Sequence, residues 1–111
     1  MSSNTIIEID ASELAQWVND ASHDLRVIDV RQMQEIAMGS VPRAEPLPLH
    51  TLPAKVHEFS REEKLVMVCR SGARSAQACM FLQEQGFSKV YNLRGGMMGW
   101  LQSGFPAHQL A

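Results

Sequence analysis

The feature of this sequence that most restricts its fold is the segment from residue 65 to residue 75, LVMVCRSGARS. Its first four residues are all apolar, and a short continuous apolar run is typical of a β-strand that is buried on both faces. A cysteine, a turn that contains Gly72 and a helical pattern follow at once. A buried strand that leads through a short turn into a helix is the repeating unit of a parallel α/β sheet.

The rest of the chain shows the same alternation of short strands and helices. Strands are predicted at about 5–8, 27–30, 65–68 and 89–93, with an edge strand near 45–47 where three prolines interrupt the chain. Helices are predicted at about 11–19, 33–38, 51–59, 75–85 and 96–102, the first of them capped by Asp10. The sequence therefore predicts an α/β fold with a mainly parallel central sheet of about five short strands, with helices on both faces, in a single domain over residues 1–111.

The charge and hydropathy of the chain argue against several classes of partner. The formal net charge is -2 at pH 7, which disfavours nucleic acid and an anionic membrane as the main partner. No apolar run approaches the ~18 residues of a transmembrane helix. The first four residues have neither the basic flank nor the apolar core of a signal peptide.

Cysteine and histidine usage restricts the chemistry further. Cys69 and Cys79 do not make a disulfide framework, so the expected compartment is the reducing cytoplasm. The four histidines have no metal-ligand spacing with one another or with the cysteines, so no metal site is expected.

Cys69 falls where a reactive thiol is best stabilised. It follows a predicted parallel strand, and ligands of such sheets bind beyond the carboxyl ends of the strands. A tight loop that enters a helix points its backbone N–H groups inward and attracts anions, and Arg70 and Arg74 add positive charge. Gly72 permits a positive φ. We therefore expect the pKa of Cys69 to lie below the free value of about 8.5, and the loop to accept an anion such as thiosulfate, arsenate or a phosphoester.

Three groups of residues resemble motifs of the rhodanese family, and together they cover nearly the whole chain. Asp29-Val30-Arg31, with Glu35 and Gly39, is similar to the first motif of the family. The segment from Cys69 to Ser75 is similar to its active-site loop. The C-terminal signature is matched by Gly86-Phe87, Val90, Leu93, Gly95-Gly96, Trp100, Gly104 and Pro106.

The resemblance implies a rhodanese-like fold and a sulfurtransferase that needs no metal or organic cofactor. Cys69 would be the nucleophile of a thiosulfate sulfurtransferase and would hold sulfur as a persulfide. The donor would be a small anion such as thiosulfate, or a persulfide, and the thiophilic acceptor could be cyanide, a small thiol or a protein thiol. The residues that would bind the donor are those of the loop, Arg70, Ser71, Gly72, Ala73, Arg74 and Ser75. Asp29, Arg31 and Glu35 would support the loop, with Arg31 paired to Glu35.

Two other functions remain open at this point. One is a persulfide carrier or interaction module within a sulfur relay, with no turnover of free thiosulfate. The other is a cysteine-dependent phosphatase or arsenate reductase, whose loop resembles Cys-x5-Arg. Here only four residues separate Cys69 from Arg74, and the shorter loop favours sulfur transfer over a tetrahedral phosphate or arsenate.

The sequence departs from the family pattern in the connection at 39–44. The family usually shows Gly-His-Ile-Pro-Gly-Ala, whereas this chain has GSVPRA. Arg43 is either an exposed loop arginine or a residue that faces the donor. Cys79 lies on the apolar face of its predicted helix, which suits a small core residue better than a second reactive thiol.

Overall fold

The computed structural model describes residues 5–110 of the chain. The elements in chain order are β1 (Ile7–Ile9), α1 (Ala11–Asn19), β2 (Arg26–Asp29), α2 (Met33–Ile36), β3 (Ala44–Pro46), the 3₁₀ helix η1 (Leu49–Thr51), α3 (Leu52–Lys55), the 3₁₀ helix η2 (Val56–Glu58), β4 (Leu65–Val68), α4 (Ala73–Glu84), β5 (Val90–Leu93) and α5 (Gly96–Gln102). The ends of the predicted single domain, residues 1 and 111, lie outside the described residues.

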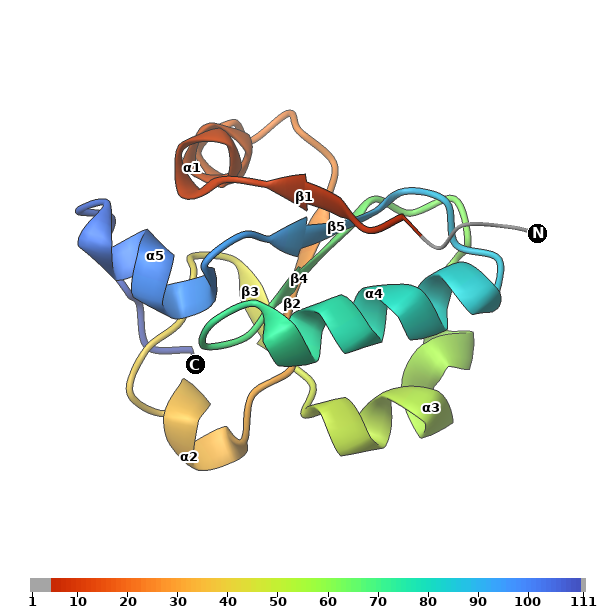
Figure 1. Ribbon diagram of the computed structural model, residues 1–111. Helices are drawn as coiled ribbons and strands as arrows, with labels where there is room; N and C mark the ends of the chain where they lie inside the picture. The colour runs from red at the N-terminus through yellow and green to blue at the C-terminus, as the bar shows by residue number, and fades with distance from the viewer. Residues whose placement is uncertain (1–4, 111) are drawn as a thin grey trace.

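The strands form one sheet in the order β1-β5-β4-β2-β3, and each neighbouring pair is parallel. β4 lies in the middle, between β5 and β2 (Figure 1). The α/β class and the mainly parallel sheet of about five short strands, which the sequence predicts, are therefore confirmed.

Helices cover both faces of the sheet, as predicted. α1 and α5 pack on one face, and α3 and α4 pack on the other (Figure 1). The side chains of β4 alternate between these two cores: Val66 and Val68 contact the first, and Leu65 and Met67 the second. All four are 0% exposed, which explains why the sequence of this strand is apolar at every position.

The largest difference from the predicted elements is at residues 49–58. The sequence predicts one helix over 51–59, but η1, α3 and η2 replace it with three short helical turns. The Leu52 N–H donates to the Leu49 carbonyl in a 3₁₀ pattern, and Pro53, the next residue, has no N–H with which to form an α-helical bond. Proline therefore accounts for the 3₁₀ turn before α3, whereas within α3 it lies in the first turn, where its missing N–H is tolerated.

Helix α4 begins two residues earlier than predicted. Its N-terminal flanking residue is Gly72, at φ 107°, a backbone conformation that glycine adopts without the steric cost of a Cβ. Because the chain turns at Gly72 itself, Ala73 and Arg74 already belong to the helix rather than to the preceding loop.

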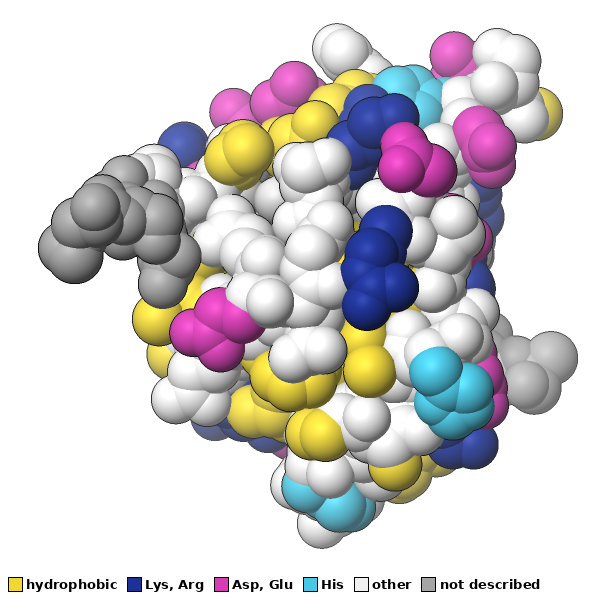
Figure 2. Space-filling view, turned by 90° about the vertical axis from the view of Figure 1, so that its right-hand side faces the viewer, with side chains coloured by type: hydrophobic (Ala, Val, Ile, Leu, Met, Phe, Trp, Pro, Cys, Tyr) yellow, Lys and Arg dark blue, Asp and Glu magenta, His cyan; other side chains and the backbone are white. Residues whose placement is uncertain are grey.

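The described surface gives two further facts. None of the helices within residues 5–110 is long and apolar enough to cross a membrane. Figure 2 shows the face on the right-hand side of Figure 1, where Lys and Arg side chains lie among Asp and Glu, and neither charge forms a continuous surface.

Helix α5 holds the turn that follows β4. The N–H groups of Met97 and Met98 donate to the carbonyl oxygens of Cys69 (2.8 Å) and Arg70 (3.0 Å), so the first turn of α5 finds its backbone partners in that turn. Gly96, at φ 57°, makes the approach possible, because a Cβ there would lie 2.5 Å from the carbonyl carbon of Arg70.

We predict that Gly96→Ala destabilises the protein by about 2–5 kcal/mol, because the added methyl group collides with backbone and the residue must keep a positive φ. Gly104→Ala is the matched control, since its φ is 88° but nothing lies within 4 Å of its Cβ position. It should cost only the left-handed strain, about 1 kcal/mol. Urea unfolding of both variants measures the difference, and equal losses would show that the close approach has no energetic importance.

Candidate active site

Cys69 directly follows β4, at the carboxyl end of the central strand of the sheet. The residue is 1% exposed, and its sulfur contacts residues of the turn after β4 and of the first turn of α4. A position beyond the carboxyl end of a central parallel strand is where α/β sheets bind ligands. The structure thus places this cysteine in the part of the fold that the sequence predicts.

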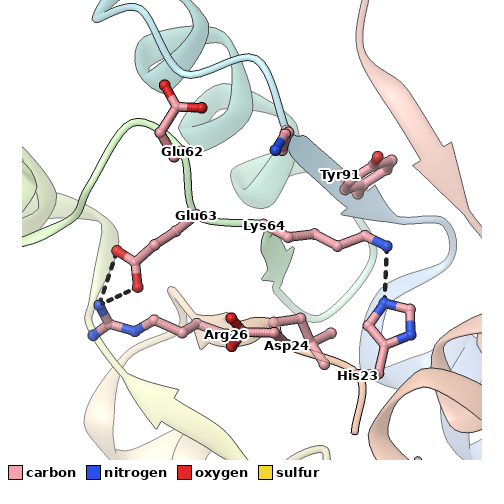
Figure 3. Close-up of a pocket in the computed structure, with 9 residues that line it drawn as sticks. His23, Asp24, Arg26, Glu62, Glu63, Lys64 and Tyr91 are labelled. Atoms are coloured by element: carbon pink, nitrogen blue, oxygen red, sulfur yellow. Dashed lines mark hydrogen bonds and ion pairs between the residues drawn. The ribbon is translucent and has the colours of Figure 1, made fainter.

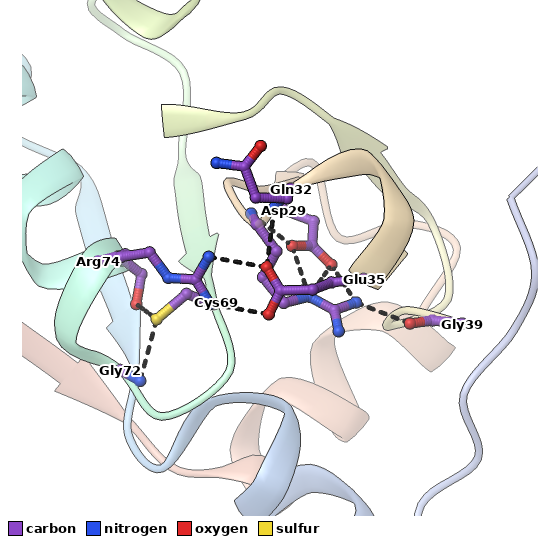
Figure 4. Close-up of polar contacts among 9 residues, drawn as sticks. Asp29, Gln32, Glu35, Gly39, Cys69, Gly72 and Arg74 are labelled. Atoms are coloured by element: carbon purple, nitrogen blue, oxygen red, sulfur yellow. Dashed lines mark hydrogen bonds and ion pairs between the residues drawn. The ribbon is translucent and has the colours of Figure 1, made fainter. Parts of the chain in front are cut away.

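Hydrogen-bond donors surround the Cys69 sulfur. The Gly72 N–H donates to Sγ at 3.1 Å (Figure 4). The Ser75 hydroxyl lies 3.3 Å from Sγ. The backbone N–H groups of Ser71 and Ser75 also favour the charged form of the sulfur and lower the pKa of Cys69. The positive φ of Gly72 turns the chain so that these groups converge.

Two opposing effects act on the pKa of Cys69. Burial raises it, because a charged sulfur loses its water. The hydrogen bonds from the Ser75 hydroxyl and from the three backbone N–H groups lower it and outweigh burial. The pKa of Cys69 is therefore lowered, in the direction that the sequence predicts, and hydrogen bonds to the sulfur are the main reason.

Cys79 has the opposite environment. It is 0% exposed, and burial, followed by the nearby charges of Glu8 and Cys69, raises its pKa to about 12. Both cysteines are free thiols. The position of Cys79 in α4, within the hydrophobic core, agrees with the prediction that it is a small core residue.

The pairing predicted between Arg31 and Glu35 is wrong. Glu35, in α2, instead accepts two hydrogen bonds from Arg74, in α4, at 2.8 and 3.0 Å (Figure 4). Arg31 turns back onto Asp29, two residues before it, with Nη2–Oδ2 at 2.8 Å. The physical reason is that Glu35 lies in the first turn of α2, and its side chain reaches Arg74 at the beginning of α4. Arg31 lies just after β2, only two residues from Asp29, so the backbone already brings these two side chains together.

A buried polar cluster forms around Asp29, at the end of the strand β2 that neighbours β4. The Asp29 carboxylate is 0% exposed and accepts hydrogen bonds from the Arg31 side chain and from the Ser40 hydroxyl, the latter at 2.6 Å. Arg31 also donates to the Gly39 carbonyl at 2.7 Å. Because both charges are paired, this cluster fixes the connection after α2 without leaving a buried charge unsatisfied.

The two arginines that follow Cys69, Arg70 in the turn and Arg74 in α4, differ in whether their charge is paired. Arg74 is held by Glu35, as described above. Arg70 is exposed, and its guanidinium has no hydrogen-bond or ion-pair partner within residues 5–110. Ser71 and Ala73 are also exposed, and Gly72 is half-buried. Arg70 is thus the cation of this turn that remains available to an anionic ligand.

Arg43 lies away from the site. It is exposed, and its guanidinium donates to carbonyl oxygens at the end of α1 and just after it, including Trp17 and His23. Of the two alternatives left by the sequence, the exposed loop arginine is confirmed. A cation among the last carbonyl groups of a helix is favourable.

A large cavity in the described part of the chain lies away from Cys69. It has a volume of about 790 Å³ and lies near the amino ends of β2, β4 and β5 (Figure 3). Two of its cations are occupied: Arg26 is bound by Glu45 and Glu63, and Lys64 contacts His23 at 2.8 Å and lies 3.7 Å from the centre of the Trp17 ring. No cysteine lines this cavity, so it offers no thiol nucleophile like the one in the turn after β4.

Sequence reasoning did not identify Asn92 and Glu8, which also belong to the site. Asn92, in β5, is 1% exposed, and its side chain bonds to Ser75, Gly72 and Glu8. The available signal was a buried polar residue within the otherwise apolar end of a strand that neighbours β4. Among residues 5–110, no group of three or more His, Cys, Asp or Glu could hold a metal ion.

The arrangement as a whole suits covalent catalysis by sulfur. Sγ can attack an electrophilic centre of an anion, and the donors around it can stabilise the charge that returns to Sγ when the new bond breaks.

Known proteins share this fold. The family model of the Rhodanese-like domain matches residues 10–103. A Sulfurtransferase of Allochromatium vinosum is 43% identical over 99 residues, which cover 89% of this chain and 92% of that protein. Thiosulfate sulfurtransferase GlpE of Glaesserella parasuis is 29% identical, with 81% and 83% covered. The crystal structure of a rhodanese-related protein from Thermoplasma volcanium gives a TM-score of 0.83 at 28% identity, with 94% and 99% covered.

The Glu35–Arg74 pair predicts a pH dependence of stability. The hydrogen bond from Arg74 lowers the pKa of Glu35 from 4.5 to about 2, so the pair stabilises the fold above pH 4.5 and this contribution is lost as the pH falls towards 2. Both side chains are about one third exposed, so Glu35→Gln should cost only about 1 kcal/mol at neutral pH.

Urea unfolding of Glu35→Gln and the unchanged protein at several pH values tests this. The two stabilities should converge as the pH falls from 4.5 to about 2. Glu62→Gln, in an exposed residue outside the site, should change stability little at any pH. A constant difference for Glu35→Gln across the series would contradict the assignment.

Proposed function

The chain belongs to the rhodanese-like domain family, and from this we propose that it is a sulfurtransferase in which Cys69 carries the transferred sulfur as a persulfide. Relatives named as sulfurtransferases cover most of its length. The observation that carries the proposal is the Cys69 sulfur itself, which is almost completely buried yet surrounded by hydrogen-bond donors that lower its pKa.

In the first half of the reaction, the Cys69 thiolate attacks the outer sulfur of a donor such as thiosulfate. A bond forms between Sγ and that sulfur, the sulfur–sulfur bond of thiosulfate breaks, and sulfite leaves with the bonding electron pair. The persulfide retains one negative charge on its outer sulfur. The backbone N–H groups of the turn are the groups that stabilise this charge.

In the second half, a nucleophilic acceptor attacks the outer sulfur of the persulfide. The bond between the outer sulfur and Sγ breaks, and its electron pair returns to Sγ as a thiolate. With cyanide as the acceptor the product is thiocyanate, and with a thiolate it is a new persulfide. Two successive half-reactions through one covalent intermediate give ping-pong kinetics.

Thiosulfate is the donor that we favour. GlpE, a relative that covers most of this chain, is named a thiosulfate sulfurtransferase. Arg70 is exposed and unpaired within the described residues, so it can bind the sulfonate oxygens and support the departure of sulfite. In this proposal Arg74 shapes the turn through Glu35 and contributes less to binding the donor than the sequence suggests.

The phosphatase or arsenate reductase alternative receives less support. Such an enzyme needs the arginine at the end of its loop to hold the tetrahedral anion. Here Arg74 makes two hydrogen bonds to Glu35, and the turn contains only four residues between Cys69 and Arg74. For the compartment we propose the cytoplasm, since the function needs a free Cys69 thiol and reducing conditions preserve it.

We predict that incubation of the reduced protein with thiosulfate adds one sulfur atom at Cys69, and that cyanide removes it with release of thiocyanate. Cys69→Ser should abolish both steps, because no thiolate remains in the turn. Cys79→Ser is the matched control and should retain most of the activity, since Cys79 is buried and its pKa is about 12. Intact mass spectrometry measures the sulfur.

The other outcomes separate the alternatives. Sulfur gained from a protein persulfide but not from thiosulfate would favour a relay carrier. Hydrolysis of an aryl phosphate without any sulfur gain would reject sulfur transfer. Equal losses in the two cysteine variants would indicate a mechanism that uses both thiols.

We also predict that substitution of Arg70 mainly weakens binding of the donor, whereas substitution of Arg74 mainly lowers the stability of the fold. Arg70→Ala should raise the KM for thiosulfate about tenfold, the effect of losing one charge-assisted hydrogen bond, with little change in stability. Arg74→Ala should lower stability, because it leaves Glu35 unpaired, and should raise KM less. Steady-state kinetics and urea unfolding of both variants provide the test; a larger KM effect in Arg74→Ala would reverse the assignment.

A further inference from the structure

Asn92 connects the Cys69 site to the far edge of the sheet. It lies in β5, next to β4, and is 1% exposed. Its Nδ2 group donates to Glu8 Oε2 at 3.0 Å and to the Gly72 carbonyl at 3.2 Å. Its Oδ1 atom accepts a short hydrogen bond from the Ser75 hydroxyl. Ser75 in turn is 3.3 Å from the Cys69 sulfur.

These partners fix the orientation of the Asn92 amide. The Glu8 carboxylate and the Gly72 carbonyl can only accept hydrogen bonds, so both must face the NH₂ group of Asn92. The amide oxygen therefore faces Ser75, and Ser75 must be the donor in that contact. Glu8 holds this orientation from the edge strand β1, 84 residues away in the sequence.

The Ser75 hydroxyl has one proton and two acceptors within reach. One is Asn92 Oδ1 and the other is Cys69 Sγ. A neutral sulfur is a weak acceptor, so the amide oxygen keeps the proton when Cys69 is a thiol or a persulfide. A thiolate is a charged acceptor, and it attracts the same proton more strongly. The hydroxyl can donate to only one of them at a time.

We propose that Asn92 is a positioning residue that competes with the Cys69 sulfur for the Ser75 proton, so that the hydroxyl stabilises charge on Sγ only when the sulfur becomes a thiolate. This rests on the proposed sulfur transfer for its consequences, but not for its geometry. Asn92 touches neither substrate nor the reacting sulfur, and it acts through Ser75.

The competition affects the two halves of sulfur transfer in opposite directions. When the donor transfers a sulfur atom to Cys69, the negative charge leaves Sγ, and the Ser75 hydroxyl returns to Asn92. When an acceptor removes the outer sulfur, the electron pair of the broken bond returns to Sγ, and Ser75 turns to stabilise it. Asn92 thus favours the uptake of sulfur from the donor and opposes its transfer to the acceptor.

Other charged and titratable groups near Cys69 come from several elements. Arg70 belongs to the turn, Arg74 to α4 and Glu35 to α2, where it pairs with Arg74. Cys79 lies in the same helix as Ser75, and its thiol stays protonated because its pKa is about 12. Glu8, on β1, completes this set, and none of these groups contacts the Ser75 hydroxyl directly within the described residues.

The test is a double-mutant cycle on the titration of Cys69, followed by the ultraviolet absorbance of the thiolate. Asn92→Leu removes the competing acceptor at similar size, and the Gly72 carbonyl keeps its hydrogen bond from the Ala76 N–H. We expect the Cys69 midpoint to fall by about 0.5 to 1 pH unit, the effect of one hydrogen bond gained by the thiolate. Ser75→Ala should raise it by a similar amount.

The decisive measurement is the combined variant. If Asn92 acts through Ser75, then Asn92→Leu should cause no further shift once Ser75→Ala is present. The same shift in both backgrounds, or no shift in either, would overturn the proposal, because it would show that Asn92 acts on the turn independently of the hydroxyl. Asn92→Ala repeats the test if the leucine does not fit, and Asn19→Ala, an exposed asparagine on α1, should leave the midpoint unchanged.

A second readout follows the half-reactions with protein loaded as the persulfide. Asn92→Leu should release thiocyanate to cyanide a few-fold faster, and Ser75→Ala should release it more slowly; slower release in Asn92→Leu would contradict the proposal. The titration needs no sulfur donor. If the protein fails to accept sulfur from thiosulfate while the cycle behaves as expected, the proposed function fails and the role of Asn92 stands.

Discussion

A buried sulfur can carry a negative charge only if hydrogen-bond donors replace the water that it has lost, and the rest of this structure depends on that requirement. Cys69 is 1% exposed, so burial alone would hold it as an unreactive thiol. Cys79 shows that outcome, since it is buried without such donors and its pKa rises to about 12. The two cysteines of one chain thus differ because backbone N–H groups and a hydroxyl converge on only one of them.

The surrounding elements keep those donors in place. The first turn of α5 binds the carbonyl groups of Cys69 and Arg70, and Glu35 holds Arg74 at the beginning of α4. The Asp29 cluster fixes the end of β2 on the neighbouring strand. Because these contacts act on both sides of the turn, the N–H groups point at Sγ before any substrate arrives, which is the condition for electrostatic stabilisation of a developing charge.

Much of the fold was predictable because its signals are local. The apolar run at β4 predicts a strand covered on both faces, and Asp10 predicts the start of α1, where its carboxylate accepts from the Glu13 N–H. The segment 49–58 was predicted less well, since the periodicity of apolar residues does not distinguish an α-helix from short 3₁₀ turns. The predicted partner of Arg31 was wrong for another reason. A sequence pattern gives the spacing of charged residues, but not the direction in which their side chains point.

The sequence by itself determined the chemistry of the turn. The cysteine, the glycine three residues later and the serine six residues later are close through the backbone, so their order in the chain predicts that they meet around one sulfur. Only the tertiary structure decided which charges and amides hold that turn. Glu35 and Arg74 are 39 residues apart, and Glu8 and Asn92 are 84 apart. Such pairs form because parallel strands bring distant segments to the same edge of the sheet, and no local pattern records which of them will meet.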